Sequence, residues 1–247
     1  MTGRILFLDP VAGMAGDMLC GALLDAGGDI DALRTALRGL RLDGFEIAAA
    51  AVQRGAFRAT HFTVRPATHS TGHRASMSGA PGSGEAVGRA VNDRGHQHDH
   101  GHQHDHGHEH GHEHGHEHDE PAFPNQPDRT WRTIQALLGA ADLPARARAR
   151  ALAAFEALAH AEARAHGLAV DDVHFHEVGG VDALVDITSA CLLLEQLQVN
   201  RVVCGVVPLG AGTVRSAHGM IPLPSPATTI LLAGWPVTAG RPGSECT

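Results

Sequence analysis

The chain has 247 residues, of which 43% are hydrophobic, enough for one large or two small domains with a sizeable core. Most of its formal net charge of −8 resides in residues 95–120, because the rest of the chain has twenty acidic residues against nineteen arginines and no lysine. This balance argues against a nucleic-acid-binding surface. The absence of lysine excludes a Walker-type phosphate loop and a Schiff-base lysine.

The cysteines and the apolar runs indicate the cellular compartment of the protein. Four cysteines are scattered without a C-x-x-C pair, so neither a zinc finger nor a disulfide framework is expected. The apolar run near residue 5 is too short for a signal peptide, and no run approaches the ~20 apolar residues of a membrane span. We therefore expect a reduced, cytoplasmic protein with no membrane partner.

Hydrophobic periodicity and turn residues predict a compact mixed α/β unit over residues 1–65. A strand is expected over 4–8, helices over 16–26 and 29–40, and strands over 45–52 and 56–64 around a turn at Arg54-Gly55. Residues 66–127 are rich in proline, glycine, serine and histidine, and we expect them to form a long disordered insert.

The pattern over residues 128–247 predicts further helical and strand elements, so the fold class is α/β. Helices are expected over 130–140, 144–166, 181–197 and 227–233, an extended segment over 173–178 and an apolar strand over 201–207. Residues 208–224 are typical of a glycine-turned hairpin or loop. Ser225 and Pro226 make a suitable N-cap and first residue for the last helix.

A histidine occupies every second position from 96 to 118, twelve in all, with only glycine, glutamine, aspartate and glutamate between them. The segment has no apolar side chain to bury, so it cannot offset the entropy of ordering its backbone. Neutral imidazole is a good ligand for nickel, copper and zinc, and equivalent sites without fixed geometry exchange metal readily. We therefore interpret the segment as a transition-metal collector that delivers metal rather than a reaction centre. Its expected ligands are His96, His98, His100, His102, His104, His106, His108, His110, His112, His114, His116 and His118.

A glycine loop joins the first expected strand to the first expected helix. Gly13 and Gly16 lie between Asp9 and Asp17, and backbone N–H groups in such a loop can approach an anion. Asp17 would hold the positive end of the helix itself, so only a phosphate bridged by a divalent ion fits there. The simpler alternative is that the two carboxylates only cap the turn and the helix.

The segment His174-Phe175-His176-Glu177 is the most informative part of the chain. Residues two apart in an extended segment point the same way, so His174 and His176 could share one metal while Phe175 is anchored in the core. Asp182 and Asp186 follow one turn apart on the next helix, a spacing at which like charges repel. These groups predict a divalent-metal or acid–base site. The alternative is a surface strand with solvated charges.

Two further features carry less weight. Glu162 and His166 are four residues apart near the end of the long helix, as expected for a surface pair or for support to a neighbouring site. His218 could be a ligand, a base or a hydrogen-bonded loop histidine.

Several segments, in the same order along the chain, resemble the LarC family of nickel insertion proteins. They are FLDPVAGMAGDMLCGALLDAG, AEARAHG, VHFHEVGGVDALVDI, PLGAGTVRSAHG and PLPSPAT. The resemblance implies insertion of Ni²⁺ into pyridinium-3,5-bisthiocarboxylic acid mononucleotide, which makes the nickel-pincer cofactor of lactate racemase. It also implies dependence on CTP with Mg²⁺ or Mn²⁺. Asp128 is a departure, because family members commonly have a histidine before the arginine at this place.

The resemblance and the residue chemistry together give candidate roles. His174, His176 and Glu177 are candidates for nickel transfer or removal of the ring proton, and the four aspartates named above for divalent-ion or phosphate contacts. Family members usually continue with a second domain, so we expect this chain to be the N-terminal half, with CTP bound mainly by a C-terminal half that is its partner. Whether copies of the chain form a homo-oligomer stays open. The alternatives are a nickel storage or delivery protein and a metal-dependent hydrolase.

Overall fold

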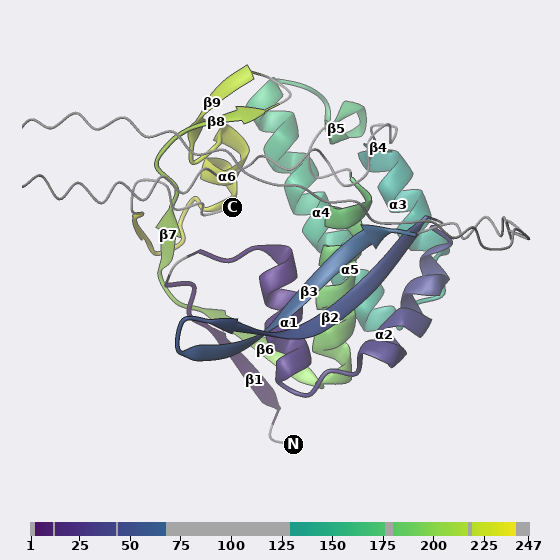
Figure 1. Cartoon of the computed structure of the whole chain (residues 1–247). Coiled ribbons are helices and arrows are strands. Elements are labelled where there is room, and N and C mark those ends of the chain that lie inside the picture. The colour runs from purple at the N-terminus through teal and green to yellow at the C-terminus, as the bar shows by residue number, and fades with distance from the viewer. Residues whose placement is uncertain are drawn as a thin grey trace, which may run out of the picture. The chain divides into compact units, whose positions relative to one another are not determined.

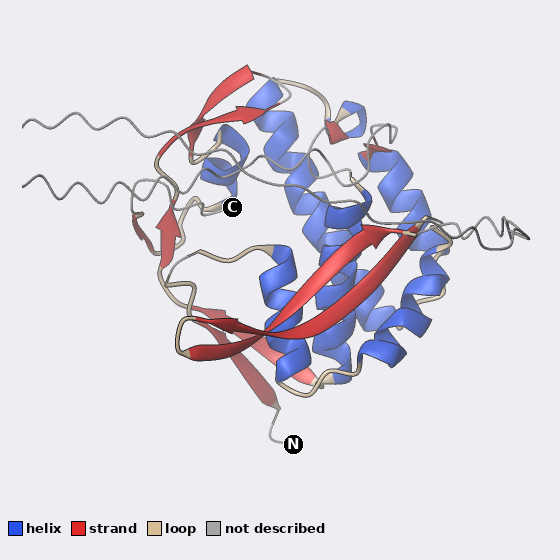
Figure 2. Cartoon of the chain, in the orientation of Figure 1, coloured by secondary structure: helices blue, strands red, loops and turns tan. Residues whose placement is uncertain are grey.

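A computed structural model describes residues 3–11, 13–42, 44–67, 129–175, 180–216 and 219–240. The histidine-rich segment and the expected insert around it lie outside these residues. The described part contains helices and five two-stranded sheets, which confirms the mixed α/β class. Figure 2 shows the helices gathered together and the strands set in small separate sheets around them.

Two strands that are distant in sequence form a parallel pair beside the helices. β1 (Arg4–Leu8) matches its predicted bounds and pairs in parallel with β6 (Val199–Cys204). After β1 the chain enters α1 (Gly16–Asp25), which packs against α5 (Val181–Gln196) (Figure 1). The stretches on either side of the expected insert therefore do not form separate cores, because strands and helices from both stretches pack together.

A long hairpin lies against α1. β2 (Phe45–Arg54) and β3 (Phe57–Pro66) are antiparallel in continuous register, with Gly55 at a φ of 58° in the turn. The hairpin and its turn were predicted, although both strands are longer than expected. Between α1 and the hairpin, α2 (Ile30–Leu37) begins at Asp29, whose carboxylate accepts the N–H groups of Asp31 and Ala32, and a 3₁₀ turn, η1 (Arg38–Leu40), follows it.

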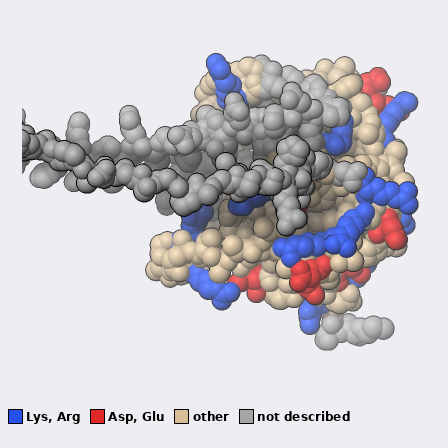
Figure 3. Space-filling model, turned by 45° about the vertical axis from the view of Figure 1, so that its right-hand side comes forward, with Lys and Arg blue, Asp and Glu red and all other residues tan. Residues whose placement is uncertain are grey.

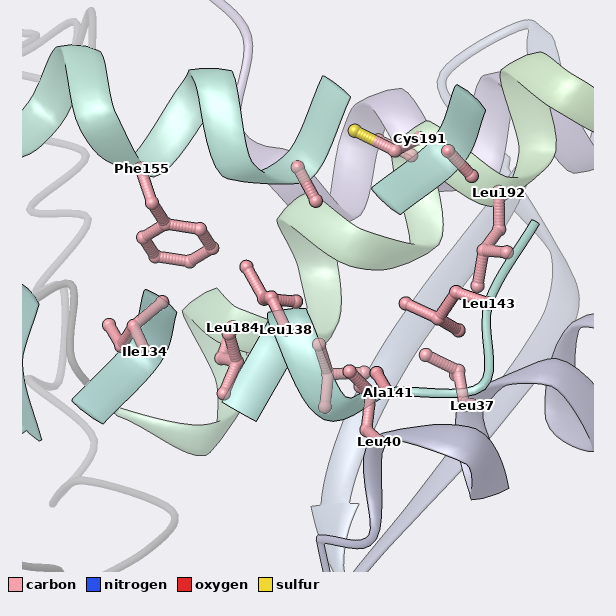
Figure 4. Packing of buried hydrophobic residues seen from close by; sticks show 14 of the residues in the cluster. Leu37, Leu40, Ile134, Leu138, Ala141, Leu143, Phe155, Leu184, Cys191 and Leu192 are labelled. Atoms are coloured by element: carbon pink, nitrogen blue, oxygen red, sulfur yellow. The ribbon is translucent and has the colours of Figure 1, made fainter. Parts of the chain in front are cut away.

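The two longest helices contribute more residues to the core than any other elements. After the short strand β4 (Arg129–Thr130), α3 (Trp131–Ala140) leads to α4 (Ala145–His166), which packs against α5. Every fourth residue of α4 from 147 to 163 is buried, and all of these except Phe155 are alanines, so neighbouring helices can approach its backbone closely. Figure 4 shows side chains from α3, α4, α5 and the η1 region meeting in one cluster.

Arginines of α4 fix the start of β6. The guanidinium groups of Arg146 and Arg150 donate to the backbone carbonyl of Val199, at 2.5 and 2.7 Å. Both also lie within ion-pair distance of Glu195, at 3.4 and 3.7 Å. The spacing of four residues puts both arginines on one face of α4, so α4 holds the junction between α5 and β6.

The predicted strand over 201–207 is wrong in its extent. β6 ends at Cys204, the Gly205 N–H donates to the Leu8 carbonyl at 2.8 Å, and the chain then bends. Val207–Leu209 forms a separate strand, β7, which pairs in parallel with β10 (Val237–Ala239). The sequence did not indicate the break at Gly205, because apolar residues occur on both sides of it, in β6 and in β7.

The elements between β7 and β10 follow the prediction. β8 (Gly212–Ser216) and β9 (Gly219–Leu223) form the expected hairpin. α6 (Pro226–Leu231) begins at Ser225, whose hydroxyl accepts the N–H of Thr228. On the face in Figure 3, arginine and acidic side chains are interspersed, in keeping with the nearly balanced charge outside residues 95–120. No helix among the described residues is long and apolar enough to cross a membrane.

Candidate functional site

The carboxyl ends of β1 and β6 meet at Asp9. Asp9 directly follows β1, and Gly205 directly follows β6. A Cβ atom added to Gly205 would lie 3.4 Å from Oδ1 of Asp9, so this carboxylate sits over the backbone at the end of the neighbouring strand. In α/β proteins, ligands commonly bind beyond the carboxyl ends of parallel strands. Asp9 is therefore placed where a ligand could reach it.

The loop between β1 and α1 turns tightly at Gly13. Gly13 has a φ of 91°, and its N–H donates to the Pro10 carbonyl at 3.1 Å. This left-handed backbone favours glycine, which explains the first glycine of the predicted loop.

Gly16 serves a different purpose, because α1 and α5 touch there. A Cβ atom at Gly16 would lie 2.9 Å from both Cβ and Oδ2 of Asp186 on α5. Further along α1, a Cβ at Gly21 would clash with the Thr60 carbonyl oxygen of β3. The two glycines let α1 lie close to both α5 and the hairpin.

Asp186 has the most perturbed carboxyl group among the described residues. Its Oδ1 atom is buried and has no hydrogen-bond partner in the part of the chain that the structure describes. Burial raises the pKa of Asp186 to about 7, and the nearby carboxylates of Asp17 and Asp182 add to the shift. Near neutral pH this side chain therefore exchanges its proton easily, as a general acid or base must.

Asp17 and Asp182 frame Asp186 from the first turns of two helices. Asp17 accepts the N–H of Met18 at 2.8 Å, and Asp182 is exposed one turn before Asp186. The sequence predicted that Asp182 and Asp186 would lie near one another. It gave no sign that α1 would bring Asp17 to the same place.

Two buried cysteines lie next to this cluster. The Cys20 thiol is buried and donates to the Asp186 carbonyl at 3.4 Å. Burial raises the pKa of Cys20 far above its usual range, with further contributions from Asp186 and Asp17. Burial also raises the pKa of Cys191 to about 11. In the absence of a metal, both thiols are therefore protonated near neutral pH.

His174 lies on the short strand β5 (His174–Phe175), which pairs with β4. The next side chain, Phe175, is 2% exposed and meets Phe155 of α4 edge to face, with ring centroids 6.2 Å apart. His174 is exposed. The predicted anchoring of Phe175 in the core is confirmed, and it directs the neighbouring histidine outwards.

His176 and Glu177, the other half of this motif, lie outside the described residues. His218 and the histidines of positions 96–118 also lie outside them. Shared binding of one metal by His174 and His176 therefore stays a prediction. Among the described residues, no group of three His, Cys, Asp or Glu side chains is arranged to hold a metal ion.

Glu162 and His166 form the predicted pair near the end of α4. Oε2 of Glu162 lies 3.4 Å from Nε2 of His166. α4 ends at Gly167, which has a φ of 68°, and the 3₁₀ turn η2 (Val170–Asp172) then leads to β5. The pair therefore sits on the helix that leads into the His174 segment.

Comparisons with known proteins agree on one family. The model of the nickel insertion protein family matches residues 6–247. A Myxococcus xanthus relative, named among nickel insertion proteins, is 37% identical over 95% of this chain and 46% of its own length. A Roseiflexus castenholzii relative with the same name is 36% identical over 99% of this chain and 48% of its own length.

A further relative has a more specific name. The pyridinium-3,5-bisthiocarboxylic acid mononucleotide nickel insertion protein of Desulfitobacterium hafniense DCB-2 is 33% identical over 96% of this chain and 45% of its own length. The chain thus spans about half the length of the curated relatives it matches. No solved structure matches it significantly. Because the family model covers nearly the whole chain, the chain belongs to the nickel insertion protein family.

Proposed function

We propose that this chain takes part in inserting Ni²⁺ into pyridinium-3,5-bisthiocarboxylic acid mononucleotide, as one half of a chelatase that makes the nickel-pincer cofactor of lactate racemase. Membership of the family supports the proposal, and so does the substrate in the name of the Desulfitobacterium relative. The region of the relatives that this chain does not span would supply the other half.

The burial and raised pKa of the Asp186 carboxyl group are the observations that support the proposed deprotonation step. Metallation of the pyridinium at C4 breaks a C–H bond, and its electron pair forms the bond to Ni²⁺ while the proton leaves to a base. Asp186 has a buried oxygen that no described residue hydrogen-bonds, and its pKa is raised to about 7, so it can accept that proton at neutral pH. We assign it this role.

Histidines would handle the metal that is being inserted. The imidazoles of positions 96–118 would collect Ni²⁺, and His174 with His176 and Glu177 would pass it to the two sulfur atoms of the substrate. Exchange between loosely bound imidazole sites suits transfer, and the soft sulfur donors then retain the nickel. The exposed position of His174 is compatible with such a transfer.

We assign CTP with Mg²⁺ or Mn²⁺ mainly to the other half, as the family resemblance implies. Asp17 brings negative charge to the start of α1, so a phosphate would bind there only when a divalent ion bridges the two. We also place the reaction in the cytoplasm, which the free thiols of Cys20 and Cys191 favour.

Reconstitution tests the function. The chain is incubated with Ni²⁺, CTP, Mg²⁺ and the bisthiocarboxylate mononucleotide, with and without the other half as a separate chain. Mass spectrometry then follows the nickel isotope pattern in the product. We expect product only when both halves are present. If nickel binds but no product forms with both halves, the chain is a nickel storage or delivery protein instead.

Substitution of the assigned base tests the mechanism. Asp186→Asn should slow insertion by about 100-fold or more, the usual contribution of a general base. Glu156→Gln, which removes an exposed carboxylate from α4, is the control and should leave the rate unchanged. The wild-type rate should rise with pH around 7, because only ionised Asp186 accepts the proton. A full rate and an unaltered pH profile for Asp186→Asn would assign the base elsewhere.

A further inference from the structure

β1 presents an apolar face that no described element covers. Leu6 packs against the core, whereas Ile5 and Phe7, which point to the opposite side of the strand, are each 62% exposed. Parallel sheets in α/β proteins normally have both faces covered, and their strands are apolar for that reason. The β1–β6 pair therefore has one face with side chains suited to burial that is open to solvent in the described part of the chain.

The backbone of β1 also has a free edge. Among the described residues β1 pairs only with β6, so no strand bonds to its other edge. Natural edge strands usually carry charged residues or proline, which prevent pairing with another chain. Residues 5–8 of β1 are Ile-Leu-Phe-Leu and include neither. This edge therefore lacks the usual protection against a further chain.

Further apolar side chains lie around the bend that follows β6. A Cβ atom added to Gly205 would lie 3.7 Å from Cζ of Phe7, so the Phe7 ring reaches the bend. The Val207 N–H donates to the Pro236 carbonyl at 3.0 Å, which brings the start of β10 to the same place (Figure 1). The exposed apolar side chains at this bend are those of Val206, Trp235 and Val237. Together with Ile5 and Phe7, we call them the apolar strand surface.

Charged groups border the apolar strand surface. In the parallel register Arg201 of β6 lies beside Ile5, and it is exposed with no hydrogen bond or ion pair in the described part of the chain. Oδ1 of Asp9 lies 3.4 Å from the Cβ position at Gly205 that the Phe7 ring also approaches. An apolar centre with a polar rim is the usual anatomy of a protein–protein interface. A partner seated on Phe7 would also border Asp9, at the carboxyl ends of the strands.

The lengths of the relatives indicate which partner this is. The chain spans 46% and 48% of the Myxococcus and Roseiflexus relatives, so about half of each lies outside the matched region. On the proposed function that half follows Thr247, which is seven residues beyond Gly240, the last described residue. Seven residues extend over at most about 25 Å. The other half would therefore begin within reach of β10, whose Val237 belongs to the apolar strand surface.

We propose that the apolar strand surface is the docking site of the other half of the nickel insertion protein. That half covers Ile5, Phe7 and the free edge of β1 with apolar side chains, and it places a carboxylate opposite Arg201. The identity of the partner rests on the proposed function, whereas the location rests on the exposed side chains. A second copy of this chain is the competing occupant.

Calorimetric titration of the full chain with the other half, produced as a separate chain, tests the surface. We expect one-to-one binding by the wild-type chain. Phe7→Glu should weaken it at least about tenfold, because the introduced charge would be buried in the interface. Phe57→Glu puts the same charge on a 79% exposed phenylalanine at the hairpin turn, and this control should bind like wild type. Circular dichroism confirms that both variants are folded.

Two further pairs of variants test the bend and the rim. Trp235→Ala should also weaken binding at least about tenfold, since buried tryptophans commonly dominate interface energies. Leu168→Ala, at an exposed apolar position after α4, is its control and should have no effect. Arg201→Glu should slow association, and the difference from wild type should shrink at high salt. Arg54→Glu at the hairpin turn should leave the association rate unchanged.

Light scattering of the chain alone distinguishes the competing occupant. We expect a monomer. A dimer that Phe7→Glu dissociates and Phe57→Glu does not would show that a second copy covers the surface, and would overturn the proposal.

The remaining outcomes separate the docking site from the proposed function. Binding of the other half that neither Phe7→Glu nor Trp235→Ala affects would overturn the surface and leave nickel insertion standing. A wild-type chain that does not bind the other half at all would also overturn the surface. Binding at this surface in a pair of halves that never inserts nickel would overturn the function and retain the docking site.

Discussion

Gly16 and Asp186 meet where α1 crosses α5, so closely that a Cβ at position 16 would lie 2.9 Å from the Asp186 side chain. The contact places the half-buried carboxyl group of Asp186 beside the first turn of α1. It also makes the position of that group sensitive to the smallest change in α1.

Gly16→Ala should lower the free energy of unfolding by about 1–3 kcal/mol, because the added methyl group forces the helices apart. Urea denaturation measures the effect. Gly139→Ala on α3 is the matched control, since no described atom other than its chain neighbours and the backbone of its own helix lies within 4 Å of a Cβ there. The control should stabilise the protein by about 0.4–1 kcal/mol through the unfolded state. Equal effects of the two variants would show that the contact is looser than described.

Asp186 should make stability depend on pH. Its pKa is about 7 in the folded protein and about 3.9 in an unfolded chain, so the folded state binds more protons between these values. Its contribution is therefore fully present below about pH 4 and is lost as the pH rises through about 7. Asp186→Asn should remove this loss and be more stable than wild type at pH 8, by roughly 2 kcal/mol after allowance for solvent screening.

Denaturation curves at pH 4 and pH 8 provide the measurement for Asp186. The variant and the wild type should be nearly equal at pH 4, where the carboxyl group is neutral. A pH-independent difference between them would indicate that Asp186 ionises normally.

The double substitution His174→Ala with His176→Ala should abolish nickel insertion while bulk nickel binding changes little. The reason is that twelve histidines of positions 96–118 remain available for collection. Insertion assays and equilibrium dialysis with Ni²⁺ give the two readouts. His61→Ala with His160→Ala also removes two imidazoles, from exposed positions of β3 and α4, and is the control for bulk nickel binding. Retained insertion in the His174 and His176 variant would remove these residues from the mechanism.

Deletion of residues 95–120 should slow insertion at limiting Ni²⁺ and leave it unchanged at saturating Ni²⁺. A collector raises the local supply of metal but makes no contact in the chemical step. The rate is measured across a nickel titration. A collapse of the rate at saturating nickel would mean that these histidines belong to the reaction centre.

Local elements of this fold could be predicted from the sequence, whereas its distant contacts could not. The period of α4 and the cap at Ser225 are local signals, and both predictions were confirmed. Valines and a cysteine dominate the run over 201–207, so the pattern did not reveal that Gly205 separates two strands with different partners. An aspartate inside the apolar helix α5 indicated an unusual site. Its contact with Gly16 depends on helix packing, which periodicity does not encode.

The pairing of β1 with β6 also delays folding of the N-terminal strand during synthesis. Arg4 and Asn200, whose backbone N–H and side-chain oxygen bond between the two strands, are 196 residues apart. At a ribosomal rate of ~5–20 residues per second, β1 waits roughly 10–40 s for its partner strand to be made. During that time Ile5 and Phe7, each still 62% exposed in the folded chain, are available to any other strand edge. The order of synthesis thus makes the first strand the part of the nascent chain most in need of protection.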